Sequence, residues 1–86
     1  MSRHVVDKTE DARKYVFGWD QSLQSYFLQV HHLDAPEDDQ IQVWLGADKD
    51  TQLYELEDFI REARKHGLTV NHDLRRQLYK DRDEGL

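Results

Sequence analysis

A run of alternating aromatic residues near the start of the chain most constrains its fold. Tyr15, Phe17 and Trp19 are separated by Val16 and Gly18, and this period of two is typical of a β-strand with one buried face. In a helix the same three rings would point in different directions. The segment is therefore predicted to be a strand whose aromatic face is covered by other parts of the chain.

Two further segments predict the remaining strands. Residues 25–32 are rich in side chains that favour β-structure, and the short polar connection before them favours a hairpin with the first strand. Residues 40–45 alternate again, with Ile41, Val43 and Leu45 on one face. The sequence therefore predicts a three-stranded antiparallel β-meander.

A first helix is predicted to begin between Asp48 and Thr51, where several residues are suitable N-caps. Gly67 is typical of a residue that ends a helix, and it follows basic residues, as the helix dipole favours. The core-facing stripe of this helix has a spacing of three and four residues and consists of Leu53, Leu56, Ile60 and Ala63, with Phe59 on its flank.

A second helix is predicted after Asn71, whose side chain is a good N-cap. Leu74 and Leu78 form a narrow apolar stripe, which Tyr79 widens. Three strands followed by two helices predict an α+β fold of the order βββαα, with both helices packed on one face of the sheet.

Length and composition bound the domain organisation. A chain of 86 residues has room for one core. Residues 1–12 are polar apart from Val5 and Val6, so we expect a disordered or frayed tail there and a single α+β domain over residues 13–86. The chain has no cysteine, no apolar leader and no long apolar run, so the expected location is cytoplasmic, away from the membrane.

No residue pattern indicates catalysis, a metal or a cofactor. His31 and His32 are neighbours in a predicted strand and point to opposite faces, so they are not expected to chelate one ion. No serine lies in a nucleophile elbow, and the four glycines are too scattered to form a phosphate-binding loop. We therefore expect a non-enzymatic protein without a cofactor or a metal.

The aromatic residues indicate an interaction surface instead. Seven of the nine lie between residues 15 and 54, and two helices can cover only one face of the sheet. If Tyr26 and Ile41 face the helices, the other face carries the mixture of aromatic and polar side chains that suits a protein interface. This candidate surface consists of Phe27, Gln29, His31, Gln42 and Trp44.

The occupant expected on this surface is another protein or a second copy of the chain, as in a homodimer. Trp44 is the expected anchor of the contact. The alternative interpretation is that the N-terminal segment or a helix covers these rings, or that they are partly exposed without binding anything.

The charge distribution allows a second function. The net charge is −6, and residues 34–58 carry nine acidic residues and one basic residue, which opposes direct binding of nucleic acid. The same segment suggests an inhibitor that imitates a nucleic-acid backbone and occupies the groove of a basic protein. Its acidic patch consists of Asp34, Glu37, Asp38 and Asp39. A solvated acidic loop is the simpler interpretation.

The hairpin segment also carries a resemblance. Gly18-Trp19-Asp20, followed by Leu23 and the aromatic pair Tyr26-Phe27, resembles a pattern near the start of small bacterial proteins of unknown function. Together with residues 43–46, the similar region covers about a third of the chain. The resemblance implies that the hairpin holds the recognisable feature, and it implies no activity, ligand or partner.

Overall fold

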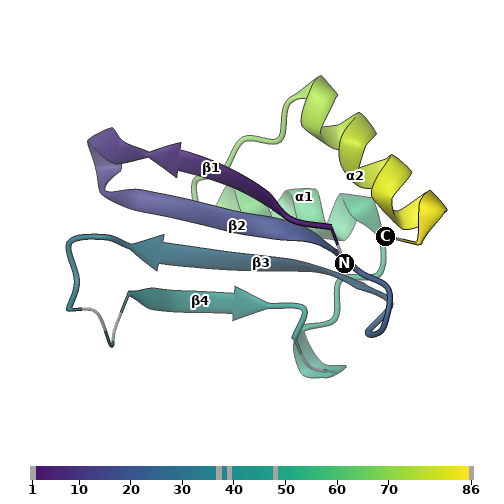
Figure 1. The fold of residues 1–86 in the computed structure, drawn as a ribbon, viewed down its shortest axis with the longest axis horizontal. Coiled ribbons are helices and arrows are strands. Elements are labelled where there is room, and N and C mark those ends of the chain that lie inside the picture. Colours follow the sequence, from purple (N-terminus) through teal and green to yellow (C-terminus); the bar gives the residue numbers. More distant parts are fainter. Residues whose placement is uncertain (1, 37, 39, 48, 86) are drawn as a thin grey trace.

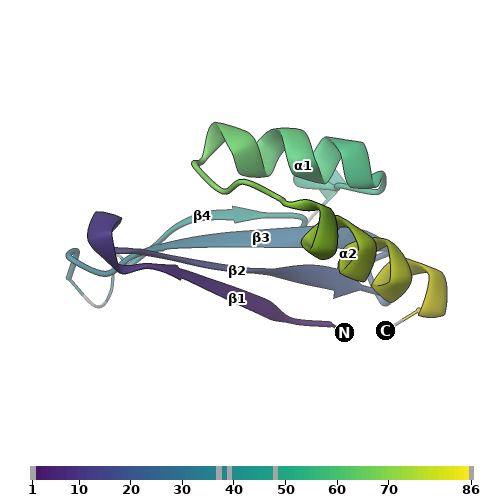
Figure 2. The same ribbon diagram turned by 90° about the horizontal axis from the view of Figure 1, so that it is seen from above.

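The computed structural model of the chain describes residues 2–36, 38, 40–47 and 49–85. A four-stranded antiparallel sheet in the order β1-β2-β3-β4 is followed by two helices, which agrees with the predicted α+β class. Both helices lie on one side of the sheet (Figures 1 and 2). The elements are β1 (His4–Lys8), β2 (Arg13–Asp20), β3 (Ser25–His32), β4 (Ile41–Leu45), α1 (Leu56–Lys65) and α2 (His72–Glu84).

The predicted hairpin of β2 and β3 forms the centre of the sheet. Phe17 lies opposite Leu28 and Trp19 lies opposite Tyr26 in an antiparallel register. Asp20 closes the connecting turn, because its Oδ1 accepts a hydrogen bond from the backbone N–H of Ser22 at 3.0 Å, which is a common local role of aspartate. The period of two in the sequence therefore corresponds to the alternation of side chains across this hairpin.

The core lies between the sheet and the helices and is built around Phe59 of α1. The ring centroid of Phe59 lies 5.8 Å from that of Phe17 and 5.6 Å from that of Tyr26, within the range in which aromatic pairs attract each other. The buried apolar cluster consists of Tyr15, Phe17, Trp19, Tyr26, Leu28, Val30, Leu53, Leu56, Phe59, Ala63, Leu68 and Leu78.

Two buried tyrosines connect the sheet to the helical layer through their hydroxyl groups. The hydroxyl of Tyr15 donates to the carbonyl of His66 at 2.8 Å, and that of Tyr26 donates to the carbonyl of Leu78 at 3.1 Å. Burial raises the pKa of Tyr26 to about 12. Each ring therefore fills the core while its hydroxyl group is satisfied by a backbone carbonyl, at the C-cap of α1 for Tyr15 and within α2 for Tyr26.

The sheet has four strands and not the predicted three, because the N-terminal segment forms a strand as well. Within residues 1–12, where we expected a frayed tail, His4–Lys8 forms the edge strand β1 and pairs with β2. The Nε2 atom of His4 lies 2.6 Å from Oδ2 of Asp81 in α2. Pairing along β2 and this contact with α2 stabilise a segment that has too few apolar residues to signal a strand.

The start of the first helix was also predicted wrongly. α1 begins at Leu56, with Glu55 as its N-cap, and not between Asp48 and Thr51. Leu53 is held in a β-bridge instead, because the backbone N–H of Tyr26 donates to its carbonyl at 2.8 Å. The predicted end is confirmed: the backbone N–H of Gly67 donates to the carbonyl of Arg64 at 3.1 Å, in the left-handed conformation that favours glycine.

The second helix begins as predicted, because Oδ1 of Asn71 accepts a hydrogen bond from the N–H of Leu74 at 2.9 Å. Its buried side differs from the prediction. Leu78 is fully buried, whereas Tyr79 is 64% exposed and does not widen the apolar stripe. The buried residue on the next turn is Asp81, which contacts His4.

Candidate interaction surface on the open sheet face

The open face of the sheet is the side away from α1 and α2. In β3, Phe27, Gln29 and His31 alternate with residues that are buried against the helices, so these three side chains lie on the open face. Trp44 of β4 lies directly opposite Gln29 in the register and therefore shares this face. The side chain of Gln42, the fifth predicted residue, lies outside the described part of the structure.

Ile41 was expected to face the helices, but the register places it on the open face. The pairing of β3 with β4 shifts between Val30 and His31, so that His31 lies opposite Ile41 while Val30 lies opposite Val43. A bulge of this kind adds one residue to a strand, so the residues beyond it change faces while Val43 and Leu45 on the other side keep theirs. Ile41 is 47% exposed and adds an aliphatic side chain to the surface.

The two predicted aromatic residues differ in exposure. Trp44 is 56% exposed, whereas Phe27 is only 8% exposed. Both line a pocket of about 230 Å³ on the open face. We call it the Trp44 pocket, and its other lining residues include Arg3, Asp20, Leu23 and Gln29. Trp44 is thus the aromatic group that a partner can reach directly.

The N-terminal segment crosses the open face above Gly18, which pairs with Phe27. The N–H of Ser2 donates to the carbonyl of Trp19 at 3.0 Å. A Cβ atom at position 18 would lie only 2.3 Å from the carbonyl oxygen of Ser2. Only glycine permits this approach. Arg3 then lines the Trp44 pocket together with Phe27, so the N-terminal segment reaches this part of the open face.

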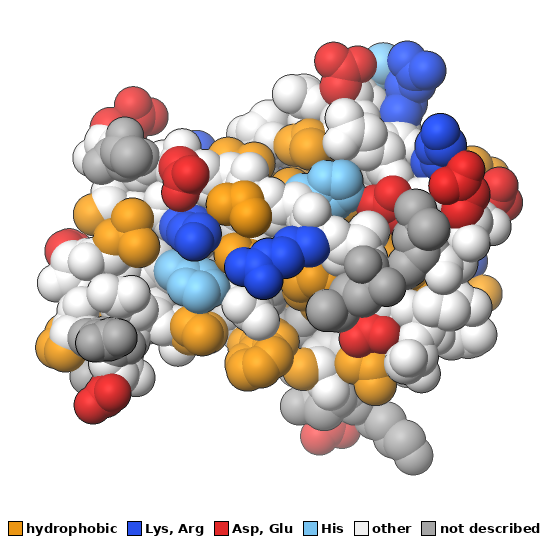
Figure 3. All heavy atoms as spheres, in the orientation of Figure 1, with side chains coloured by type: hydrophobic (Ala, Val, Ile, Leu, Met, Phe, Trp, Pro, Cys, Tyr) orange, Lys and Arg blue, Asp and Glu red, His pale blue; other side chains and the backbone are white. Residues whose placement is uncertain are grey.

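Basic side chains occupy the centre of the open face (Figure 3). The pKa of His31 is lowered from its ordinary value by burial and by the nearby positive charges of Lys14 and Arg3. Sequence reasoning missed Arg3 because it was assigned to a tail. The glycine at position 18 was the available signal, since a glycine inside a strand often marks a close backbone approach.

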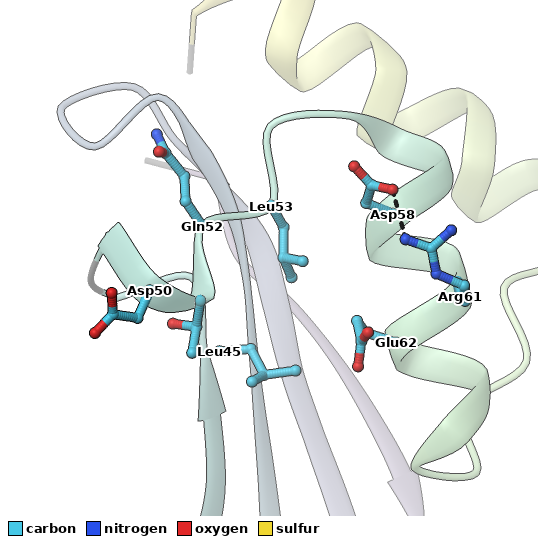
Figure 4. A pocket seen from close by; sticks show the side chains of 8 residues that line it. Leu45, Asp50, Gln52, Leu53, Asp58, Arg61 and Glu62 are labelled. Atoms are coloured by element: carbon cyan, nitrogen blue, oxygen red, sulfur yellow. Dashed lines mark hydrogen bonds and ion pairs between the residues drawn. The ribbon is translucent and has the colours of Figure 1, made fainter.

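The described residues of the predicted acidic patch lie in a loop, outside the strands that carry this surface. Asp34 and Asp38 are exposed in the connection between β3 and β4, while Glu37 and Asp39 lie outside the described residues. A separate open groove of about 350 Å³ lies between α1 and the end of β4 (Figure 4). It is lined by Leu45 and Leu53 and by the carboxylates of Asp50, Asp58 and Glu62; Oδ1 of Asp58 also accepts a hydrogen bond from Arg61 at 2.7 Å.

The described ranges contain no cluster of three or more histidine, aspartate or glutamate side chains that could hold a metal ion. None of the helices in those ranges is both long and apolar enough to cross a membrane. Comparison of the chain with protein-family models, with curated proteins and with solved structures found no match.

Proposed function

We propose that this protein is a non-enzymatic interaction module that binds another protein through the open face of its sheet. The observation that carries this proposal is the exposure of Trp44. This indole lies on β4, is 56% exposed, and lines a pocket together with Phe27. Buried tryptophans are frequent anchors of protein interfaces because they remove a large apolar area from water.

The surroundings of Trp44 support the same function. Ile41 extends the apolar area on the same strand, while Gln29, Arg3 and His31 provide polar groups at its border. Aromatic and aliphatic side chains next to polar ones are a usual composition of a protein interface. If a partner buries Trp44, removal of the indole is expected to weaken binding by at least about 2 kcal/mol, which is about 30-fold in affinity.

The test is recovery of binding proteins on the immobilised chain from a nuclease-treated lysate of its source cell, with wild type, Trp44→Ala and Tyr79→Ala compared. Tyr79 is a matched control because it is also an aromatic residue that is more than half exposed, but it lies on α2. We expect a stoichiometric partner that is retained by Tyr79→Ala and lost by Trp44→Ala. A partner that binds both variants equally would contradict the proposal.

A second candidate function is supported by the exposed carboxylates of Asp34 and Asp38. An acidic loop that imitates a nucleic-acid backbone would bind a basic protein through charge, and this binding would weaken steeply as the salt concentration rises. The variant Asp34→Asn/Asp38→Asn separates the two functions. Binding through the open face persists in this variant and at high salt, whereas binding through the acidic loop is lost under both conditions.

A further inference from the structure

β4 is an edge strand with one side unpaired in the described part of the chain. It pairs with β3 and is the last strand of the sheet. In Figure 1 no other strand or helix of the described residues lies along its outer side. A free edge presents unpaired backbone N–H and C=O groups, to which a further strand can bind.

The direction of the hydrogen bonds shows which residue of β4 faces outward. The N–H groups of Tyr26 and His32 donate to carbonyls on the β4 side of β3, so even-numbered residues of β3 direct their backbone groups toward β4. Val43 and Leu45 are the partners of even-numbered residues and face β3. The backbone groups of Trp44 therefore point away from the sheet.

The two edges of the sheet are protected to different degrees. β1 carries the charged residues Asp7 and Lys8, and its first residue, His4, is bound to Asp81 of α2. β4 consists of four apolar residues, Trp44 among them, and one glutamine, and it contains no charged residue and no proline. Charged residues and proline are the usual means of preventing pairing at an edge, so β4 is the edge that remains open to another strand.

The charges around β4 indicate the chemistry of the occupant. Residues 34–50 contain six acidic residues and one lysine. Asp34 and Asp38 precede the strand, and Asp50 follows it and lines the groove beside α1. Two copies of β4 would bring these acidic segments together in either direction of pairing, which like-charge repulsion opposes. A strand with basic residues at its ends is attracted instead.

We propose that the outer edge of β4 binds an extended segment of the partner protein as an added strand, with lysine or arginine residues at the ends of that segment. This inference rests on the proposed function of the open face. The backbone of the added strand forms hydrogen bonds with the outward N–H and C=O groups of Trp44. Its apolar side chains contact the indole of Trp44 and the aliphatic side chain of Ile41. Main-chain bonds supply affinity in this mode of binding, and alternate side chains supply specificity.

A synthetic peptide of alternating valine and threonine, with lysines at both ends, is the probe. Peptides that are N-methylated on one or the other set of alternate residues are compared with it, because only one set of amides can face β4. We expect one methylated set to weaken binding at least about tenfold and the other to have little effect. Protection of the Trp44 amide from hydrogen exchange is expected only when the peptide binds.

Charge is tested with the same peptide carrying glutamates in place of the lysines. We expect the glutamate peptide to bind at least about tenfold more weakly. Equal binding of the two peptides, or binding that neither methylated set weakens, would overturn the proposed strand addition. Self-association of the protein that protects the Trp44 amide would also overturn it, since the occupant would then be a second copy.

The failure of this inference can be told from the failure of the proposed function. If a captured partner depends on Trp44 but does not protect the Trp44 amide, the open face binds proteins while the strand addition is wrong. If the captured partner is insensitive to Trp44→Ala, the proposed function itself is wrong.

Discussion

Tyr26 and Phe27 are neighbours in β3 and lie on opposite faces of the sheet. Tyr26 is fully buried among rings of β2 and α1 and donates a hydrogen bond to α2. Phe27 forms part of a shallow pocket next to the exposed Trp44. The helix-covered face therefore contains the contacts that stabilise the fold, whereas the open face leaves apolar area exposed to solvent. The predictions below test this division.

The largest expected effect comes from removing the ring at the centre of the helix-covered face. Phe59→Ala is expected to lower the free energy of unfolding by about 3–5 kcal/mol, because it leaves a cavity between two aromatic side chains. Trp44→Ala is expected to lower it by about 1 kcal/mol or less, since the indole is more than half exposed. Urea unfolding of both variants measures the difference.

A milder variant keeps this comparison measurable if Phe59→Ala does not fold. Phe59→Leu retains part of the buried apolar volume and is expected to fall between the wild type and Phe59→Ala. If Trp44→Ala lowered the free energy of unfolding as much as Phe59→Leu does, the open face would stabilise the fold as much as the covered face, and the division would be wrong.

Gly18→Ala tests the part of the open face that the chain covers by itself. The new Cβ collides with the carbonyl of Ser2, so Ser2 and Arg3 are expected to leave the sheet, with a loss of about 1–3 kcal/mol of stability. NMR chemical shifts are expected to change at Arg3 and Phe27 but not in α1. In a variant that lacks residues 1–3, Gly18→Ala is expected to lower the free energy of unfolding much less. An equal loss in the two backgrounds would show that a collision with Ser2 is not its cause.

The smallest expected effect is the change in stability with pH that follows from the protonation of His31. Because burial, Lys14 and Arg3 lower its pKa, NMR is expected to show a midpoint below the ordinary value of 6.5. The folded state then binds fewer protons at His31 than the unfolded state. The resulting stability is present above pH 6.5 and is lost as the pH falls through the lowered pKa.

Lys14→Gln is the matched variant for this titration. It removes one of the positive charges near His31, so it is expected to raise the pKa of His31 and to reduce the loss of stability at acidic pH. A midpoint that stays unchanged in Lys14→Gln would show that burial alone causes the shift.

Local patterns in the sequence determined the central part of the fold. The alternation around Phe17 predicted β2, because the side chains of one strand face are buried together, and the short polar connection after it predicted the pairing with β3. Asn71 marked the start of α2 because its side chain accepts a hydrogen bond from a free backbone N–H of the first turn. Gly67 marked the end of α1 because glycine adopts the left-handed conformation in which its N–H reaches a free carbonyl of the last turn. The alternation in residues 40–45 separated Trp44 from Val43 and Leu45, and this separation predicted the candidate surface.

Tertiary structure alone decided the remaining features, since each depends on a contact between distant residues. β1 forms because β2 offers a free edge and Asp81 binds His4. α1 starts late because Leu53 is bridged to Tyr26. Ile41 changes face through a bulge, and Arg3 reaches the Trp44 pocket because Gly18 lets the chain pass. A sequence window records local spacing, whereas these outcomes follow from which segments meet in space.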